Sequence, residues 1–379
     1  MKPPPLPRES PEACGLARSH VGEAARLVRA AVDQGHAPGA VLLLGRRGKV
    51  AYEAAFGVAV ARPNPIPTRR DTIYDLASLT KCVATGMCVA ALLEEGRVRL
   101  DDPIARHLPE FADAARLPGL ADRSRITVRH LAVHRAGLPA GGAYRGRRLT
   151  LREILPEIAR SRVMAPPGER FLYSDFSAIV LGALVESVEG MDLHQAARRR
   201  IFSPLGMDDT GFRPGPYCAP RCASTNEERD EASSDRGRVH DPTAKALGGT
   251  AGHAGLFSTA EDLSRLCACL LAGGTLGQAR ILRPETVSLC TGAIDTTGGI
   301  ARGLLWDIDS PYSIRAGLSP RSFGHTGFTG TSIWLDPDAE AFAILLTNAV
   351  HSRPATNGVI ALRRAVSNAL AMAIRDAPP

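Results

Sequence analysis

The chain has 379 residues, of which 44% are hydrophobic, and a net charge of +7. This length and composition suit one large soluble globular domain or two ordinary ones. The basic residues are spread along the chain with few dense runs, so no nucleic-acid partner is expected. The longest apolar runs, residues 83–93 and 178–185, are too short to span a membrane and suit buried helices.

The N-terminal segment and the cysteines bear on the cellular compartment. Residues 1–17 open with Lys2 and a proline run in place of an apolar signal, so we expect a mobile tail and a cytoplasmic protein. The eight cysteines are scattered, mostly in apolar contexts, which suits a reducing compartment. Cys218 and Cys222 lie close together but lack a second ligand pair at suitable spacing, so no metal site is expected.

Hydrophobic periodicity predicts the elements in chain order. A helix is expected over residues 21–34, followed by a hairpin of two strands over 40–44 and 50–56. The middle of the chain is mostly helical, with Pro and Gly at its breaks. A stretch over 212–250, rich in Pro, Gly and charge, is typical of a long surface loop. Further strands are expected over 303–308, 331–335 and 341–347, and a closing helix over about 358–374.

The two ends of the chain both carry strand patterns, which predicts that they meet in one sheet. The expected fold class is α/β, more strictly α+β, with an antiparallel sheet flanked by helices and a mainly helical insertion. Residues 18–379 then form a single domain. Its sheet part spans about 18–65 plus 285–379 and its helical part about 66–284.

Ser78 and Lys81 stand three residues apart at the start of an expected helix that ends before Gly96, with Asp75 as its cap. Residues three apart share one helix face, so Ser78 Oγ and Lys81 Nζ can come within hydrogen-bonding distance. Burial would lower the pKa of Lys81 and let it activate a nucleophilic Ser78. Lys81 is also one of only four lysines among 46 basic residues. Alone, the pattern equally fits a helix start with an exposed lysine.

Two later segments change that balance. The first ends in Tyr-Ser-Asp directly before an apolar helix, and the second contains His-Thr-Gly ahead of a strand. The residues are Tyr173, Ser174 and Asp175 in the first segment and His325, Thr326 and Gly327 in the second.

With Ser78-x-x-Lys81 these segments follow the order Ser-x-x-Lys, Tyr-x-Asn, Lys-Thr-Gly. The sequence thus resembles the serine β-lactamase and penicillin-binding-protein superfamily, in particular its class C β-lactamase-like branch of esterases and D-alanyl-D-alanine carboxypeptidases. The segments around His134 and His253 also match this family, and we expect both histidines to be structural. The resemblance covers the chain from about residue 20 to its end.

The resemblance implies an acyl-enzyme mechanism without a metal or an organic cofactor. Ser78 would attack a carbonyl, Lys81 and Tyr173 would move the proton, and water would release the acid. By family position, the backbone N–H groups of Ser78 and Phe328 would form the oxyanion hole. His325, Thr326 and Gly327 would line the substrate site.

Two residues depart from the family pattern. Asp175 replaces the usual Asn and, if ionised near Lys81, would raise the pKa of this lysine and favour a Tyr173 phenolate as the base. Asp175 could also simply cap the following helix. His325 replaces the usual lysine, and a mostly neutral imidazole binds a substrate carboxylate more weakly.

These departures and the cytoplasmic expectation favour a carboxylic ester as the small-molecule substrate. D-alanyl-D-alanine carboxypeptidase or weak β-lactamase activity on an amide is the alternative. A non-catalytic penicillin-binding-like sensor is a third possibility, against which the retention of Ser78, Lys81 and Tyr173 argues. Which of Lys81 and Tyr173 is the base stays open at this stage.

Overall fold

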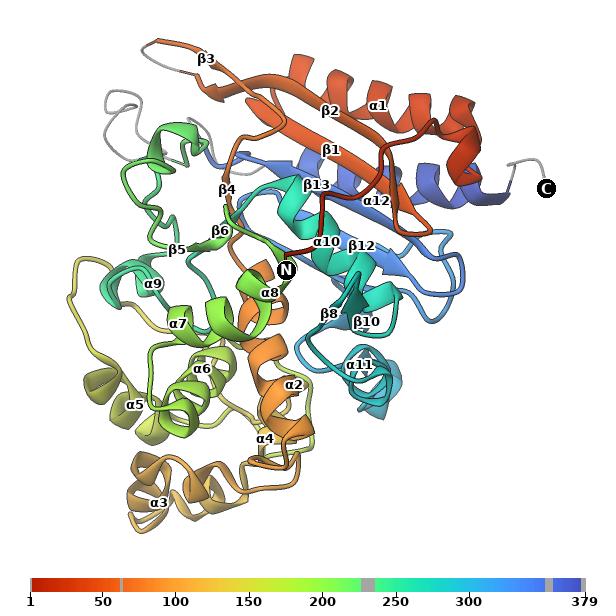
Figure 1. The fold of residues 1–379 in the computed structure, drawn as a ribbon. Coiled ribbons are helices and arrows are strands. Elements are labelled where there is room, and N and C mark those ends of the chain that lie inside the picture. The colour runs from red at the N-terminus through yellow and green to blue at the C-terminus, as the bar shows by residue number, and fades with distance from the viewer. Residues whose placement is uncertain (1, 62–63, 226–235, 352–356, 376–379) are drawn as a thin grey trace.

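The computed structural model describes residues 2–61, 64–225, 236–351 and 357–375. An eight-stranded antiparallel sheet joins the two ends of the chain (Figure 1). Its strands are, in spatial order, β3 (Ile66–Pro67), β2 (Lys49–Val60), β1 (Gly39–Arg46), β13 (Ala341–Thr347), β12 (Ser332–Asp336), β11 (Phe323–Thr326), β10 (Asp307–Asp309) and β9 (Ala301–Arg302). The predicted fold class, an antiparallel sheet built from both chain ends and flanked by helices, is confirmed.

Strand β1 lies inside the sheet, between β2 and β13, and is buried on both faces. Ala40, Leu42 and Leu44 pack toward α1 (Arg18–Asp33) and α12 (Asn357–Arg375), which cover one face. Val41 and Leu43 point to the other face, because side chains alternate along a strand. There α10 (Ala260–Leu271) packs against β1 and β13. The expected helical part, about 66–284, includes α10. The structure instead packs the apolar face of α10 against the sheet.

A mainly helical layer lies beyond α10, on the side of the sheet away from α1 and α12 (Figure 1). Its helices are α2 (Met87–Glu94), α3 (Pro109–Ala115), α4 (Val128–Ala132), α5 (Leu151–Arg160), α6 (Asp175–Glu189), α7 (Leu193–Ala197) and α8 (Ser203–Leu205). Helix α6 is central to this layer, since residues 176–185 are buried on every side.

Short elements connect the helical layer to the sheet. They are β4 (Tyr74–Asp75), β5 (Gly211–Phe212), α9 (Pro242–Ala246), β6 (Leu256–Ser258), β7 (Thr275–Leu276), β8 (Ala279–Arg280) and α11 (Pro284–Thr291). Within the expected loop at 212–250, residues 226–235 lie outside the described residues. The expected strand at 303–308 is only partly formed: residues 303–306 make the turn between β9 and β10, and 307–308 belong to β10, with Asp307 opposite Arg302.

The N-terminal residues differ from the mobile tail expected for 1–17. Leu6, Cys14 and Leu16 are buried. Val50 N–H donates to Pro7 O at 2.9 Å, which ties the segment to β2. Three well-spaced apolar side chains are too sparse a pattern to predict this packing from the sequence.

All eight cysteines are free thiols, and Cys222 Sγ donates to the Cys218 carbonyl oxygen at 3.5 Å. Across the described ranges, no helix is both long enough and apolar enough to cross a membrane.

Candidate active site

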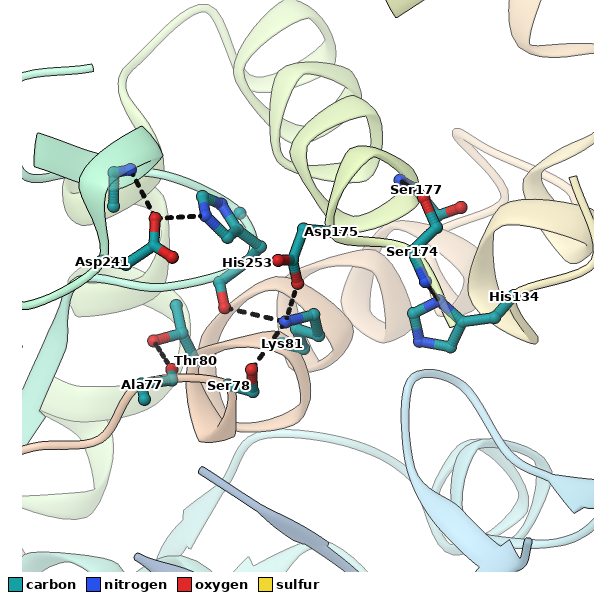
Figure 2. A network of polar contacts seen from close by, with 12 residues as sticks. Ala77, Ser78, Thr80, Lys81, His134, Ser174, Asp175, Ser177, Asp241 and His253 are labelled. Carbon is teal, nitrogen blue, oxygen red and sulfur yellow. Dashed lines mark hydrogen bonds and ion pairs between the residues drawn. The ribbon is translucent and has the colours of Figure 1, made fainter. Parts of the chain in front are cut away.

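Ser78 lies at a sharp turn between β4 and the first long helix of the helical layer. Strand β4 pairs with β6, and the chain then turns through Ala77, whose φ of 47° is left-handed. Asp75 Oδ1 accepts the Ala77 N–H at 2.9 Å and holds this turn. A π-helical turn, η2 (Lys81–Gly86), leads into α2. Lys81 Nζ therefore lies 2.9 Å from Ser78 Oγ, as the spacing predicts (Figure 2).

The Lys81 ammonium is fully buried and has three hydrogen-bond acceptors. They are Ser78 Oγ at 2.9 Å, Asp175 Oδ1 at 2.8 Å and the His253 carbonyl oxygen at 3.1 Å. Burial lowers the pKa of Lys81, but the Asp175 carboxylate and, after it, Tyr173 outweigh this effect, so the pKa is raised above its ordinary value. Lys81 is thus an ammonium that donates to Ser78.

Asp175 is the first residue of α6 and does not cap it, contrary to the alternative role considered for it. The N-cap is Ser174, whose Oγ accepts the Ser177 N–H at 3.2 Å. The Asp175 carboxylate is therefore free to face Lys81, and it is partly exposed. Figure 2 shows Asp175 and Ser78 on opposite sides of the lysine.

Tyr173 lies two residues before α6, with its ring centroid 5.1 Å from Lys81 Nζ. The ring packs on His134, with centroids 4.7 Å apart. His134 is buried, and its Nδ1 accepts the Ser174 N–H at 3.2 Å. Burial and then the charge of Arg302 lower the pKa of His134 well below its ordinary value, so a neutral imidazole supports the Tyr173 segment.

The end of β11 meets the backbone just before Ser78. Thr329 Oγ1 donates to Asp75 O at 2.8 Å, and Thr331 Oγ1 donates to Leu76 O at 3.1 Å. A Cβ at Gly327 would lie 2.5 Å from Leu76 O, so only glycine allows this approach. These contacts fix the Phe328 peptide relative to the turn that carries Ser78.

His325 and Phe328 flank this junction differently. His325 is buried, and its Nδ1 donates to the Thr326 carbonyl oxygen at 2.8 Å. Burial, followed by the charges of Arg302 and Lys81, lowers the pKa of His325 well below its ordinary value. The Phe328 side chain is 66% exposed, and its ring stacks on His240 with centroids 5.6 Å apart.

The sequence model of the family described as Beta-lactamase matches residues 24–366. The chain belongs to this β-lactamase family. It is a serine hydrolase of the β-lactamase fold. The predicted superfamily resemblance is confirmed.

Relatives in the family carry different names. A protein of Escherichia coli (strain K12) named D-alanyl-D-alanine carboxypeptidase is 30% identical over 380 residues, covering 93% of this chain and 87% of that protein. The hydrolase EstCE1, described as having promiscuous acyltransferase activity, has a TM-score of 0.75 at 26% identity, covering 93% of this chain and 99% of its own. A penicillin-binding protein homologue from Caulobacter crescentus has a TM-score of 0.74 at 21% identity, covering 94% of this chain and 99% of its own. This likeness shows the fold alone.

The predicted site residues of this β-lactamase-family chain come together in space, and they are joined by Asp241, which no sequence motif indicates. This residue is the N-cap of α9, and its Oδ1 accepts the Ala244 N–H at 2.7 Å. His253 Nε2 also donates to Asp241 Oδ1, at 2.8 Å. The Asp-Pro step at 241–242 signals a helix start, but it does not reveal that the carboxylate faces the site.

Asp175, Asp241 and His253 each place one potential ligand atom within 4.8 Å of the others, a grouping close enough for a metal ion. Their existing bonds account for it without one, since Asp175 holds the Lys81 ammonium and Asp241 holds His253.

Proposed function

We propose that this chain hydrolyses a carboxylic ester through an acyl intermediate on Ser78. The observation that carries the proposal is the buried Lys81 ammonium between Asp175 and Ser78 Oγ, at 2.8 and 2.9 Å. A serine hydroxyl in this setting needs only a nearby base and an oxyanion site to attack a carbonyl carbon.

Tyr173 is the base in this proposal. The Asp175 carboxylate, 2.8 Å from Lys81 Nζ, helps to raise the pKa of this lysine, and the resulting ammonium has no lone pair with which to take a proton from Ser78. The Tyr173 ring lies 5.1 Å from the same ammonium, so this tyrosine lies beside the Ser78–Lys81 pair. In acylation, Tyr173 takes the Ser78 proton while Oγ bonds to the carbonyl carbon. It then gives that proton to the departing alkoxide as the C–O bond breaks.

The N–H groups of Ser78 and Phe328 stabilise the oxyanion. The contacts of Thr329 and Thr331 with the backbone before Ser78 support this pairing, because they fix the two peptides relative to each other. In deacylation, a water molecule loses a proton to Tyr173 and attacks the acyl carbon. The Ser78 oxygen leaves and regains that proton.

The environment of the site favours an ester without a carboxylate. His325 is buried and neutral, so it does not supply the cation that the family's usual lysine would give. Exposed aromatic rings add apolar surface: Phe328 is 66% exposed, and Tyr312 is 54% exposed with its ring centroid 5.6 Å from that of Tyr173. The likeness to EstCE1 supports the same choice.

The test compares the wild type with Ser78→Ala on p-nitrophenyl butyrate, a fluorophosphonate probe and a fluorescent penicillin. We expect ester turnover and probe labelling in the wild type, with both lost in Ser78→Ala. Folded wild-type protein that neither turns over esters nor reacts with the probe would contradict the proposal.

A D-alanyl-D-alanine carboxypeptidase is the second candidate. The name and 30% identity of the Escherichia coli relative favour it. Penicillin labelling of Ser78, together with release of D-alanine from a D-Ala-D-Ala peptide and no ester turnover, would replace the ester proposal with this one.

The eight free thiols support a reducing, cytoplasmic compartment.

A further inference from the structure

A chain of hydrogen bonds leads from the turn before Ser78 to a second layer of residues. Asp75 Oδ2 accepts the backbone N–H of His240 at 2.7 Å. The next residue, Asp241, accepts from His253 Nε2 at 2.8 Å. The His253 carbonyl oxygen in turn accepts from Lys81 Nζ at 3.1 Å. Because Lys81 also donates to Ser78, these bonds form a closed path around the nucleophile.

The His253 peptide is held from two sides. On one side Thr85 Oγ1 donates to Gly252 O at 2.7 Å, and a Cβ at Gly252 would lie 2.0 Å from Ala178 O, so the backbone packs tightly on α6. On the other side the buried His253 ring is fixed by Asp241, which the N-terminus of α9 holds in place. Loss of the ring anchor would free the peptide between His253 and Ala254 to rotate, and its carbonyl would leave Lys81.

The Asp241 carboxylate also acts through its charge. One of its oxygens lies within 4.8 Å of an Asp175 carboxylate oxygen. Burial raises the pKa of Asp241, but the hydrogen bond and charge of His253 outweigh it and leave the pKa below its ordinary value. Two carboxylates therefore act on one buried ammonium.

We infer that Asp241 and His253 are positioning residues of the Ser78–Lys81 pair. They hold the carbonyl that receives the third N–H of Lys81, and the Asp241 charge helps to keep Lys81 an ammonium. The inference rests on the proposed function, in which Lys81 acts as an ammonium. Neither side chain needs to touch the substrate.

Other ionisable groups also act on Lys81 or feel its charge, and the test must separate Asp241 from them. On other elements around the lysine these groups are Asp175, Tyr173, His134 and His325, and on its own helical turn the group is Cys82.

Four variants test the assignment: Asp241→Asn, His253→Ala, His253→Gln and Asp192→Asn. Asn keeps the helix cap of α9 and removes the charge. Gln can place its Nε2 near that of His253, so it is the conservative rescue. Asp192→Asn is the matched control, because Asp192 caps α7 by the same bond, from the Gln195 N–H at 2.8 Å.

The readout is the pH dependence of fluorophosphonate labelling of Ser78, with kcat and KM for p-nitrophenyl butyrate measured alongside. For Asp241→Asn and His253→Ala we expect labelling at pH 7.5 and kcat to fall about 10- to 100-fold, with little change in KM. In Asp241→Asn the alkaline limb should also move down by about one pH unit, because removing an anion lowers the pKa of Lys81. His253→Gln should recover most of the rate, and Asp192→Asn should match the wild type.

Wild-type labelling and an unshifted alkaline limb in folded Asp241→Asn and His253→Ala would overturn the inference. A second result would also overturn it. In that case the variants would have a lower melting temperature and a smaller fraction of molecules with a reactive Ser78, this fraction would account for all of the lost activity, and the pH profile of the remaining sites would be unchanged. If the wild type labels but hydrolyses no ester, the proposed substrate fails, and the labelling profiles still decide the roles of Asp241 and His253.

Discussion

Replacement of Asp175 by Asn tests how Ser78 is activated. The substitution keeps the shape of the side chain and restores the Tyr-x-Asn pattern of the family, but it removes the charge that faces Lys81. Asp175 Oδ1 lies 2.8 Å from the fully buried Lys81 Nζ. Burial alone lowers the pKa of Lys81, and the carboxylate is the main cause that reverses this. Without it, the pKa of Lys81 should fall.

The size of the change follows from this distance. Two unit charges 2.8 Å apart interact by about 6 kcal/mol at an effective dielectric constant of ~20. The Asp175 side chain is 34% exposed, so solvent screening removes part of this, and about half is a reasonable remainder. The remaining ~3 kcal/mol corresponds to about two pH units in the pKa of Lys81.

The assay is the pH profile of kcat/KM on p-nitrophenyl butyrate from pH 5 to 10, with Asp192→Asn as the control. If the ammonium form of Lys81 is required, Asp175→Asn should bring the alkaline limb down by about two pH units from its wild-type position above the ordinary pKa of lysine, with no gain in activity at pH 7 to 8. If a neutral Lys81 is the base, the same variant should be more active at pH 7 to 8. Higher activity in that range would refute Tyr173 as the base.

Two further substitutions test the framework of the site and the buried charges beneath it. Gly327→Ala would place a Cβ 2.5 Å from Leu76 O, so kcat should fall about 100- to 1000-fold through loss of the oxyanion geometry. The control is Gly22→Ala, whose Cβ would meet no atom within 4 Å and should leave kcat unchanged. Asp262 is buried, and burial raises its pKa to about 7. Its folded pKa exceeds its unfolded value, so ionisation destabilises the folded state progressively from about pH 4 to pH 7. The unfolding free energy of Asp262→Asn minus that of the wild type should therefore rise by about 3 to 4 kcal/mol from pH 4 to pH 8, as measured by urea denaturation. An equal difference at both pH values would contradict this.

The sequence predicts those parts of the site that depend on local spacing. Ser78 and Lys81 lie three residues apart at one helix start, so their meeting is a property of helix geometry. Strands β1 and β13 are apolar up to their last residues, Arg46 and Thr347, which identifies both as buried and predicts the sheet they share.

Other features depend on contacts between distant segments. Asp241 lies in a stretch without periodic pattern, and its pairing with His253 follows from how α9 folds back against the loop before β6. The cap of α6 depends on which of two adjacent polar residues turns inward, and the sequence permits both Ser174 and Asp175. The N-terminal segment packs through a few apolar residues that have no regular spacing.

The most direct test of the central claim is mass spectrometry of the protein quenched during turnover of a slowly deacylated ester. We expect the wild type to carry one acyl group, on the peptide that contains Ser78, and the Ser78→Ala variant to carry none and to be inactive. Wild-type turnover by Ser78→Ala, or an acyl group on any other residue, would contradict the assignment of Ser78 as the nucleophile.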